Sequence, residues 1–402
     1  MGRVAVIGAG IQGVCVALEL ARRGCRVDLF DRESDILSRA SLWNEGKIHL
    51  GYLYANDHTL RTARMMMQGS LQFARLIERW TSLSPSRLNV SSPFRYLVPV
   101  ESLLEPAAIE RHFKAVTDLI REAFEASGCS YLGQELPAEP FARLDDRKQD
   151  VDSSRTAAIY RTSEVSVDPA QIRAALKRAL DACSRIRPFL RTRVCSVARA
   201  DNGRLQICAE RGAGEVAGYD SVVNTSWEDR LRIDATIGLN EDRPWLHRYK
   251  IAIHVNGYDG PPLGSTTMLL GPFGDLVEFA TGHLYLSWYP CCRIGSWTDL
   301  CPPDMPPILA EHERAEVVAA TLKGLGQYLP SARSLDLSRC EVTVAGGHIF
   351  SWGNTEITDP VSELHNRFDI GVHRRDNYFS IDTGKYCKAP LFAEQVGAMI
   401  AP

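Results

Sequence analysis

VAVIGAGIQG, residues 4–13, decides the fold of this chain. An apolar run of strand type is followed at once by G-x-G-x-x-G, whose glycines are Gly8, Gly10 and Gly13. Residues 14–23 have the pattern of a helix, and residues 26–30 form a second strand that ends at Asp31. Strand, glycine turn, helix, strand and acid in this order are the dinucleotide-binding fingerprint in the context that it requires.

Each residue of the fingerprint has a physical task. Gly8 permits the tight turn, Gly10 lets the backbone approach a pyrophosphate at the helix N-terminus, and Gly13 lets the helix pack closely on the strand. Asp31 is placed where its carboxylate can accept hydrogen bonds from ribose hydroxyl groups. The alternative, a glycine-rich turn in another kind of α/β protein, accounts for fewer of these features.

The composition describes an ordinary globular protein with no bias toward a charged partner. The 402 residues suffice for two domains, and the formal net charge is only −3. We therefore expect no nucleic acid partner, and no apolar run is long enough for an integral membrane segment. The first strand starts near residue 3, which predicts a cytoplasmic protein without a signal peptide. The eleven cysteines form no C-x-x-C pair, so we predict reduced thiols and no metal site.

A loop at residues 41–54, SLWNEGKIHLGYLY, gives the first specific resemblance. Gly46 and Gly51 interrupt any regular helix there, and the loop mixes polar and aromatic side chains. Together with the fingerprint it resembles the FAD-dependent D-amino-acid oxidase superfamily, which includes glycine and sarcosine oxidases and the 2-hydroxyglutarate and glycerol-3-phosphate dehydrogenases. Residues 221–227 and 377–386 are similar to two further elements of that superfamily.

The resemblance implies an α/β fold with two domains. It predicts a Rossmann-like FAD-binding domain of the glutathione-reductase type, with an inserted α+β substrate domain built on an antiparallel sheet. Alternating apolar segments between residues 244 and 337, separated by turn dipeptides, favour that sheet. We assign residues 1–58, 155–232 and 340–402 to the discontinuous FAD-binding domain. Residues 59–154 and 233–339 are assigned to the substrate domain.

The resemblance also assigns the cofactor and the residues that hold it. Two later elements return to the nucleotide site, which favours FAD over NAD, and no firm attachment motif is present, so we predict non-covalent FAD. The predicted cofactor contacts come from the fingerprint, the 41–54 loop and the later elements: Gly8, Gly10, Ile11, Gln12, Gly13, Asp31, Arg32, Ser41, Asn44, Gly46, Lys47, Ile48, Val194, Asn224, Thr225, Trp227, Gly384, Lys385 and Tyr386.

Two residues are candidates for catalysis. The resemblance places His49 near the flavin ring, where it can act as a base, and the alternative is a structural histidine that hydrogen-bonds the loop backbone. Lys385 precedes the last helix, where it can support the negative charge of a reduced flavin. The alternative for Lys385 is a surface lysine, which the positive end of the helix disfavours.

The predicted substrate contacts are Tyr52, Tyr289, His348 and Arg374. In the amino-acid oxidases an arginine at the position of His348 helps to hold the substrate carboxylate. Either the substrate lacks that carboxylate, or another cation serves instead. Candidate cations are Arg367, Arg374 and Arg375, and candidate aromatics above the flavin are Tyr285, Trp288 and Tyr289, whose alternative role is sheet packing.

The resemblance predicts an FAD-dependent oxidase or dehydrogenase. Its first expected reaction is hydride removal from a C–N bond of a small amine or amino-acid-like substrate, with oxygen or a carrier as electron acceptor. A 2-hydroxy acid or another CH–OH substrate is the alternative. Lower alternatives are a flavin monooxygenase and a non-catalytic dinucleotide-binding protein.

Overall fold

The computed structural model describes residues 2–128, 130–135, 137–210, 216–306 and 308–402. A six-stranded sheet carries the fingerprint, and all its strands are parallel except the edge strand β19. This sheet confirms the predicted α/β class. Its strands, in spatial order, are β19 (Gly371–Arg375), β20 (Tyr378–Asp382), β12 (Ser221–Asn224), β1 (Arg3–Ile7), β2 (Arg26–Phe30) and β8 (Ile186–Phe189).

Alternate residues of β1 supply two different hydrophobic cores, one on each face of this sheet. Val4 and Val6 pack with residues of the helices α1, α2 and α9. Ala5 and Ile7 pack with residues of a small antiparallel sheet and of α5. The strand is apolar on both faces because both faces are covered, as parallel sheets require. The small sheet consists of β11 (Val216–Tyr219), β10 (Leu205–Ala209) and β9 (Val194–Arg199).

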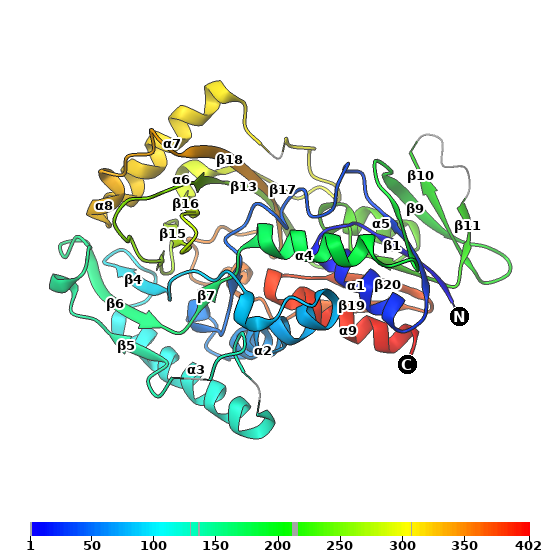
Figure 1. The fold of residues 1–402 in the computed structure, drawn as a ribbon, viewed down its shortest axis with the longest axis horizontal. Coiled ribbons are helices and arrows are strands. Elements are labelled where there is room, and N and C mark those ends of the chain that lie inside the picture. Colours follow the sequence, from blue (N-terminus) through cyan, green and yellow to red (C-terminus); the bar gives the residue numbers. More distant parts are fainter. Residues whose placement is uncertain (1, 129, 136, 211–215, 307) are drawn as a thin grey trace.

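The second large sheet has nine strands and lies on the other side of the molecule (Figure 1). It is mainly antiparallel, with one parallel pair, β4 and β14. Its strands, in order, are β17 (Arg293–Trp297), β13 (Trp245–Asn256), β16 (Leu284–Trp288), β15 (Gly274–Glu278), β14 (Thr266–Met268), β4 (Arg95–Pro99), β6 (Thr156–Thr162) and β5 (Phe141–Arg143), with β18 (Glu341–Trp352) paired to β13.

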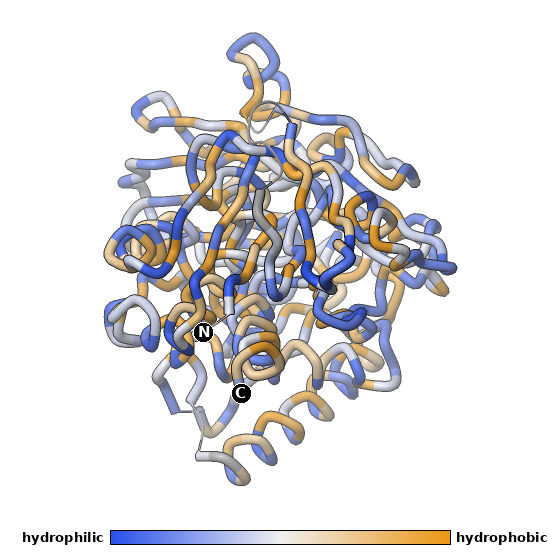
Figure 2. Tube along the Cα trace, turned by 90° about the vertical axis from the view of Figure 1, so that its right-hand side faces the viewer, coloured by the Kyte–Doolittle hydropathy of each residue, from blue (hydrophilic) through white to orange (hydrophobic). Residues whose placement is uncertain are grey.

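The helices cover these sheets. Along α2, apolar residues recur at helical spacing and are buried, as its sequence predicts. In Figure 2 hydrophilic and hydrophobic residues alternate along the extended segments, as expected for sheets with differently covered faces. The helices are α1 (Ile11–Arg22), α2 (Arg61–Thr81), α3 (Pro106–Ser127), α4 (Pro169–Asp181), α5 (Arg230–Thr236), α6 (Tyr289–Cys292), α7 (Glu311–Leu325), α8 (Pro330–Arg333) and α9 (Ala389–Ile400).

Short elements connect the two parts. The 41–54 loop contains the two-residue strand β3 (Lys47–Ile48), which pairs with β7 (Val165–Ser166), and the 3₁₀ turn η1 (Tyr52–Tyr54). The predicted N-cap of α4 is confirmed, since the Asp168 side chain accepts a hydrogen bond from Ala170 N at 2.8 Å. The 3₁₀ turn η6 (Tyr386–Lys388) leads into α9.

The predicted division into domains differs from the sheet pairing at two strands. The boundaries at residues 155 and 340 place β6 and β18 in the FAD-binding domain, but both hydrogen-bond within the nine-stranded sheet. β18 pairs with β13 along twelve consecutive residues. The long ladder requires an antiparallel partner that comes 85 or more residues earlier in the chain, and no local pattern in β18 identifies that partner.

Candidate active site

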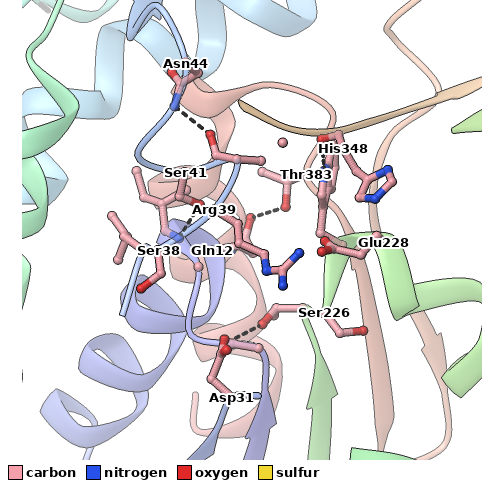
Figure 3. Close-up of a pocket in the computed structure, with 18 of the residues that line it drawn as sticks. Gln12, Asp31, Ser38, Arg39, Ser41, Asn44, Ser226, Glu228, His348 and Thr383 are labelled. Atoms are coloured by element: carbon pink, nitrogen blue, oxygen red, sulfur yellow. Dashed lines mark hydrogen bonds between the residues drawn. The ribbon is translucent and has the colours of Figure 1, made fainter. Parts of the chain in front are cut away.

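A cavity of about 300 Å³ lies where the two large sheets meet. We call its two ends the glycine end, next to Gly8 and Asp31, and the lysine end, formed by His49, Lys250 and Lys385. Figure 3 shows polar side chains from distant parts of the sequence around this cavity, among them Gln12, Asp31 and Thr383.

The glycine end requires glycine for geometric reasons. Gly8 has a φ of +96°, and a Cβ atom on Gly13 would lie 1.7 Å from Gly8 O. The α1 N-terminus therefore approaches β1 more closely than any side chain would permit. Ile11 N donates to Ser41 Oγ at 3.0 Å, which fixes the 41–54 loop beside this turn.

Asp31 closes the glycine end, as the fingerprint predicts. Its carboxylate accepts hydrogen bonds from Ala9 N at 2.5 Å and from Glu33 N at 2.7 Å. Burial raises the pKa of Asp31, although these two bonds act in the opposite direction. The carboxylate thus links the glycine turn to the end of β2 and lines the cavity.

A segment that we call the strap, residues 301–306, contacts the residues around the glycine end. Asp304 forms ion pairs with Arg39 at 2.9 Å and Arg32 at 3.4 Å. Cys301 Sγ donates to Asp229 Oδ1 at 3.0 Å. The side chains of Arg32, Arg39 and Asp229 all line the cavity, so the strap holds part of the cavity wall from behind.

His49 lies at the lysine end and is 1% exposed. Its Nδ1 atom has no hydrogen-bond partner within the described residues, and its ring lies 5.4 Å from the ring of Tyr54. Burial first, and then the nearby charges of Lys385 and Lys47, hold the pKa of His49 well below its usual value. The imidazole is therefore neutral at pH 7.

Lys385 lines the same end of the cavity. Burial, partly offset by Glu45, lowers its pKa to about 8. Its ammonium group makes no hydrogen bond or ion pair with the part of the chain that the structure describes. A lysine of this kind changes its charge near neutral pH, which is typical of functional sites.

Three strands of the nine-stranded sheet bring further polar side chains to the lysine end. Asp275 lies between two lysines, with Oδ1 3.7 Å from Lys47 Nζ and Oδ2 3.8 Å from Lys250 Nζ. The Lys47 ammonium also lies 3.8 Å from the centre of the Phe94 ring. Lys250 and Tyr285 face the cavity from β13 and β16. This sheet therefore forms a polar roof over the lysine end.

Most predicted cofactor residues lie on the cavity. Predicted residues that line it are Gly8, Gly10, Ile11, Gln12, Asp31, Arg32, Ser41, Asn44, Lys47, Val194, Thr225, Trp227, Gly384, Lys385 and Tyr386. Four others lie behind its wall: Gly13 packs α1 on the turn, Gly46 O accepts from Val167 N, Ile48 pairs with Val165, and Asn224 holds Ser226 and Asp234.

The predicted substrate residues are dispersed. Tyr52, the first residue of η1, is fully buried against α3, where its hydroxyl contacts Thr117 Oγ1 at 3.0 Å. Arg374 is exposed on the hairpin of β19 and donates to Asp376 O. His348 borders the cavity, but its ring packs on Tyr249 and its Nε2 contacts Pro303 O of the strap.

Tyr289 is the fourth predicted substrate residue, and it lies beside the roof. Its hydroxyl accepts a hydrogen bond from Arg248 Nη1 at 3.1 Å. Trp288 belongs to the outer face of the sheet, where it packs on Phe273 and Tyr328. Of the three predicted roof aromatics, Tyr285 alone lines the cavity.

Sequence reasoning missed several residues that line the cavity. Lys250 carried a usable signal, because a lysine within the apolar strand RYKIAIHV (residues 248–255) faces a covered sheet and needs a special environment. No sequence signal marks the other cavity residues, because their positions depend on tertiary contacts. They are Arg39, Glu45, Arg193 and Glu228.

The cavity has the features that FAD requires at both ends. A Cβ atom on Gly8 would collide with the backbone of Thr225 and Ser226, and one on Gly13 with Gly8 O, so the turn keeps its close packing only with glycine, and Asp31 lines the cavity beside it. At the lysine end, His49, Lys250 and Lys385 supply polar groups that face the cavity and suit the polar atoms of a flavin ring. These features define a dinucleotide-binding protein.

Comparisons with known proteins give the family. The sequence profile of the family described as FAD dependent oxidoreductase (DAO) matches residues 3–349. This chain belongs to that family, and its cofactor is FAD. A relative named FAD-dependent monooxygenase FPY4, from Fusarium mangiferae, is 25% identical over 296 residues, which cover 73% of this chain and 65% of the relative. The chain thus spans slightly under two thirds of that relative.

Two solved structures have a similar fold. Glycine oxidase from Geobacillus kaustophilus has a TM-score of 0.67 at 16% identity, with 100% of this chain and 94% of that chain covered. L-alpha-glycerophosphate oxidase from Mycoplasma pneumoniae, solved with FAD bound, has a TM-score of 0.64 at 13% identity, with 100% and 95% covered. Among the described residues no helix is long and apolar enough to cross a membrane. No group of metal-ligand type was found in the same residues.

Proposed function

We propose that this protein is an oxidase or dehydrogenase that removes a hydride from a C–N bond of a small amine or amino-acid-like substrate. The observation that carries the proposal is the lysine end, where a buried neutral His49 with a free Nδ1 shares a cavity with Lys385. When bound, FAD supplies the chemistry by accepting the hydride. The glycine oxidase fold supports an amine substrate.

The chain's own residues would then have separate tasks. We assign His49, a neutral imidazole at the lysine end, to accept the N–H proton of the substrate. Lys385 supplies positive charge at the same end. Tyr285 and Lys250 on the roof orient the substrate and exclude water.

The test is an anaerobic reduction screen of the FAD-loaded protein. Amines, amino acids and 2-hydroxy acids are mixed with it, and the loss of flavin absorbance near 450 nm, roughly the position of the flavin band, is followed in time. We expect fast bleaching with one class of amine. Bleaching by hydroxy acids alone would favour the alternative CH–OH substrate, and bleaching by neither class would refute the proposal. Reoxidation with oxygen or with an artificial carrier identifies the electron acceptor.

A second candidate is a flavin monooxygenase, favoured by the name of the fungal relative. Such an enzyme is reduced by a nicotinamide nucleotide rather than by its substrate. Bleaching by NADPH, with no bleaching by amines, would support it. The same preparation tests non-covalent attachment, because acid precipitation should release the yellow colour into solution.

A further inference from the structure

Two buried arginines lie beside the lysine end without a carboxylate partner. We call Arg248 and Arg367 the arginine pair; they are 4% and 9% exposed. Within the described part of the chain, neither guanidinium group has a carboxylate oxygen within 4.0 Å. The buried acid Asp382, whose charge acts on Arg367, pairs with Arg230 at 3.8 Å.

The partners of the arginine pair are neutral. Arg248 donates to Tyr289 Oη at 3.1 Å and to Ser351 Oγ at 3.3 Å, while its Nε has no partner. Arg367 Nη1 donates to Phe350 O at 3.1 Å. Burial first, and then repulsion from Arg248, lowers the pKa of Arg367 to about 10. Two buried arginines that repel each other, with no carboxylate in contact, are costly unless an anion joins them.

The arginine pair lies near the lysine end, behind residues that line it. Tyr249 and Ile251 of β13 face the outer core, so Arg248 and Lys250 project together from the opposite face, which forms the roof. The Tyr54 hydroxyl is buried without a partner in the described structure, and its ring contacts that of His49. The charge of Arg367 also affects the pKa of Lys385.

The charged side chains leave an excess of positive charge at two places, the lysine end and the arginine pair. At the lysine end, Lys47, Lys250 and Lys385 face Asp275 and Glu45, which leaves one positive charge in excess. The arginine pair adds two more, with Asp382 as the acid whose charge acts on Arg367 and no carboxylate oxygen within 4.0 Å of either guanidinium in the described residues. A substrate with one carboxylate would satisfy the lysine end alone.

We propose that the arginine pair binds a second acidic group of the substrate, so that the preferred substrate is an amine or amino acid with two carboxylates. The inference rests on the proposed function, since it says which residues bind the end of that substrate remote from the amine. Guanidinium groups suit this task, because they bind carboxylates through two parallel hydrogen bonds.

The first experiment measures binding without turnover. The FAD-loaded protein is titrated calorimetrically with glutarate, which has two carboxylates and no amine, and with butyrate. We expect glutarate to bind at least about 30-fold more tightly than butyrate, the loss typical of an unpaired buried charge. Arg248→Met and Arg367→Met should remove this difference, whereas Arg374→Met, a matched change on the exposed hairpin of β19, should keep it.

The second experiment measures reduction. Glutamate is compared with 2-aminopentanoate, which lacks the second carboxylate, for both enantiomers. We expect the ratio of reduction rate to dissociation constant to favour glutamate by about 30-fold in the wild type and to fall toward unity in the Met variants. If those variants do not fold, Arg248→Lys and Arg367→Lys, which keep the charge but lose the planar fork, should weaken glutarate binding relative to Arg374→Lys.

The outcomes separate this inference from the proposed function. Equal binding of glutarate and butyrate, or full glutarate affinity in both Met variants, would overturn the inference. Reduction by single-carboxylate amines without any preference for glutamate would also overturn it and would leave the proposed function standing. Glutarate binding that depends on the arginine pair, without reduction by any amine, would support the inference and refute the proposed function.

Discussion

Glu164 Oε1 accepts a hydrogen bond from Gly51 N at 2.9 Å, which ties the 41–54 loop to the turn between β6 and β7. The same oxygen also accepts from Leu50 N and Tyr52 N, and the other carboxylate oxygen contacts Tyr96 Oη. Glu164 is fully buried. One carboxylate therefore holds the segment that presents His49 to the cavity.

Glu164→Gln should destabilise the protein and disorder this loop. The amide would place N–H groups against backbone N–H donors, and we expect a loss of about 2 kcal/mol in the free energy of unfolding. Urea unfolding measures the change, and calorimetric titration of FAD should show weaker binding. Glu125→Gln, at an exposed position of α3, is the control. Equal stability of the two variants would contradict this account.

Gly13→Ala should abolish FAD binding. The added Cβ would lie 1.7 Å from Gly8 O, a backbone atom that cannot move without opening the glycine turn. The purified variant should be colourless, and FAD titration should show no saturation. Gly2→Ala tests the method, because a Cβ there has no neighbour closer than 3.7 Å. A yellow Gly13→Ala protein would show that α1 and β1 are less closely packed than described.

His49→Gln should slow flavin reduction by about 100- to 10,000-fold, the usual effect of losing a general base. Affinity for a non-reacting substrate analogue should change little. His58→Gln, on the exposed turn before α2, should reduce at the wild-type rate. A His49→Gln enzyme of normal rate would assign the proton to another group or to the bulk solvent.

The charge of Lys385 should make the reaction sensitive to alkaline pH. Lys385 is protonated below its pKa of about 8 and neutral above it, so its electrostatic support is lost as the pH rises through about 8. The ratio of the wild-type reduction rate to that of Lys385→Met should fall between pH 7 and pH 9.5, a range of about one unit or more on either side. Because both enzymes are measured with the same substrate at the same pH, titration of the substrate amine cancels in this ratio of rates. Lys385→Arg, which stays charged, should give no such fall.

Glu19 should make the protein sensitive to acid. It is fully buried and bonds Arg22, Arg23 and Trp80. Burial raises its pKa, but these bonds outweigh burial and lower it to about 2. Because the folded pKa is the lower one, the contribution of about 2 kcal/mol is complete above the unfolded value near 4.5 and is lost toward pH 2.

Urea unfolding at several pH values tests this prediction. The difference in unfolding free energy between wild type and Glu19→Gln should be largest near neutral pH and should shrink below about pH 4.5. Glu110→Gln, which removes a partly exposed pair with Lys114 on α3, should change stability by less than about 0.5 kcal/mol. A difference that does not depend on pH would mean that Glu19 contributes through packing alone.

The glycine end could be predicted from sequence because its parts are contiguous. A strand, a turn, a helix and a strand occupy residues 3–31, and each step between them is fixed by local steric rules at Gly8 and Gly13. The α4 cap at Asp168 was predictable for the same reason. Such signals need no knowledge of distant partners.

The lysine end could not be predicted in the same way. Lys47, Lys250 and Asp275 meet only because β13, β15 and the 41–54 loop come together in space. The family resemblance predicts Tyr52 and Arg374 as substrate contacts, but a sequence motif does not determine the direction in which each side chain points. The η1 turn directs Tyr52 into the α3 core, and the hairpin places Arg374 on its exposed side.

The strap has a consequence for the lifetime of the loaded protein. Residues 301–306 hold Arg32, Arg39 and Asp229 in the cavity wall, so we expect a nucleotide in the glycine end to leave faster when these contacts open. Retention then depends on an escape rate as well as on equilibrium affinity, so the holoprotein should survive dilution far below its dissociation constant. Asp304 is exposed, so added salt should weaken its ion pairs and shorten that survival time.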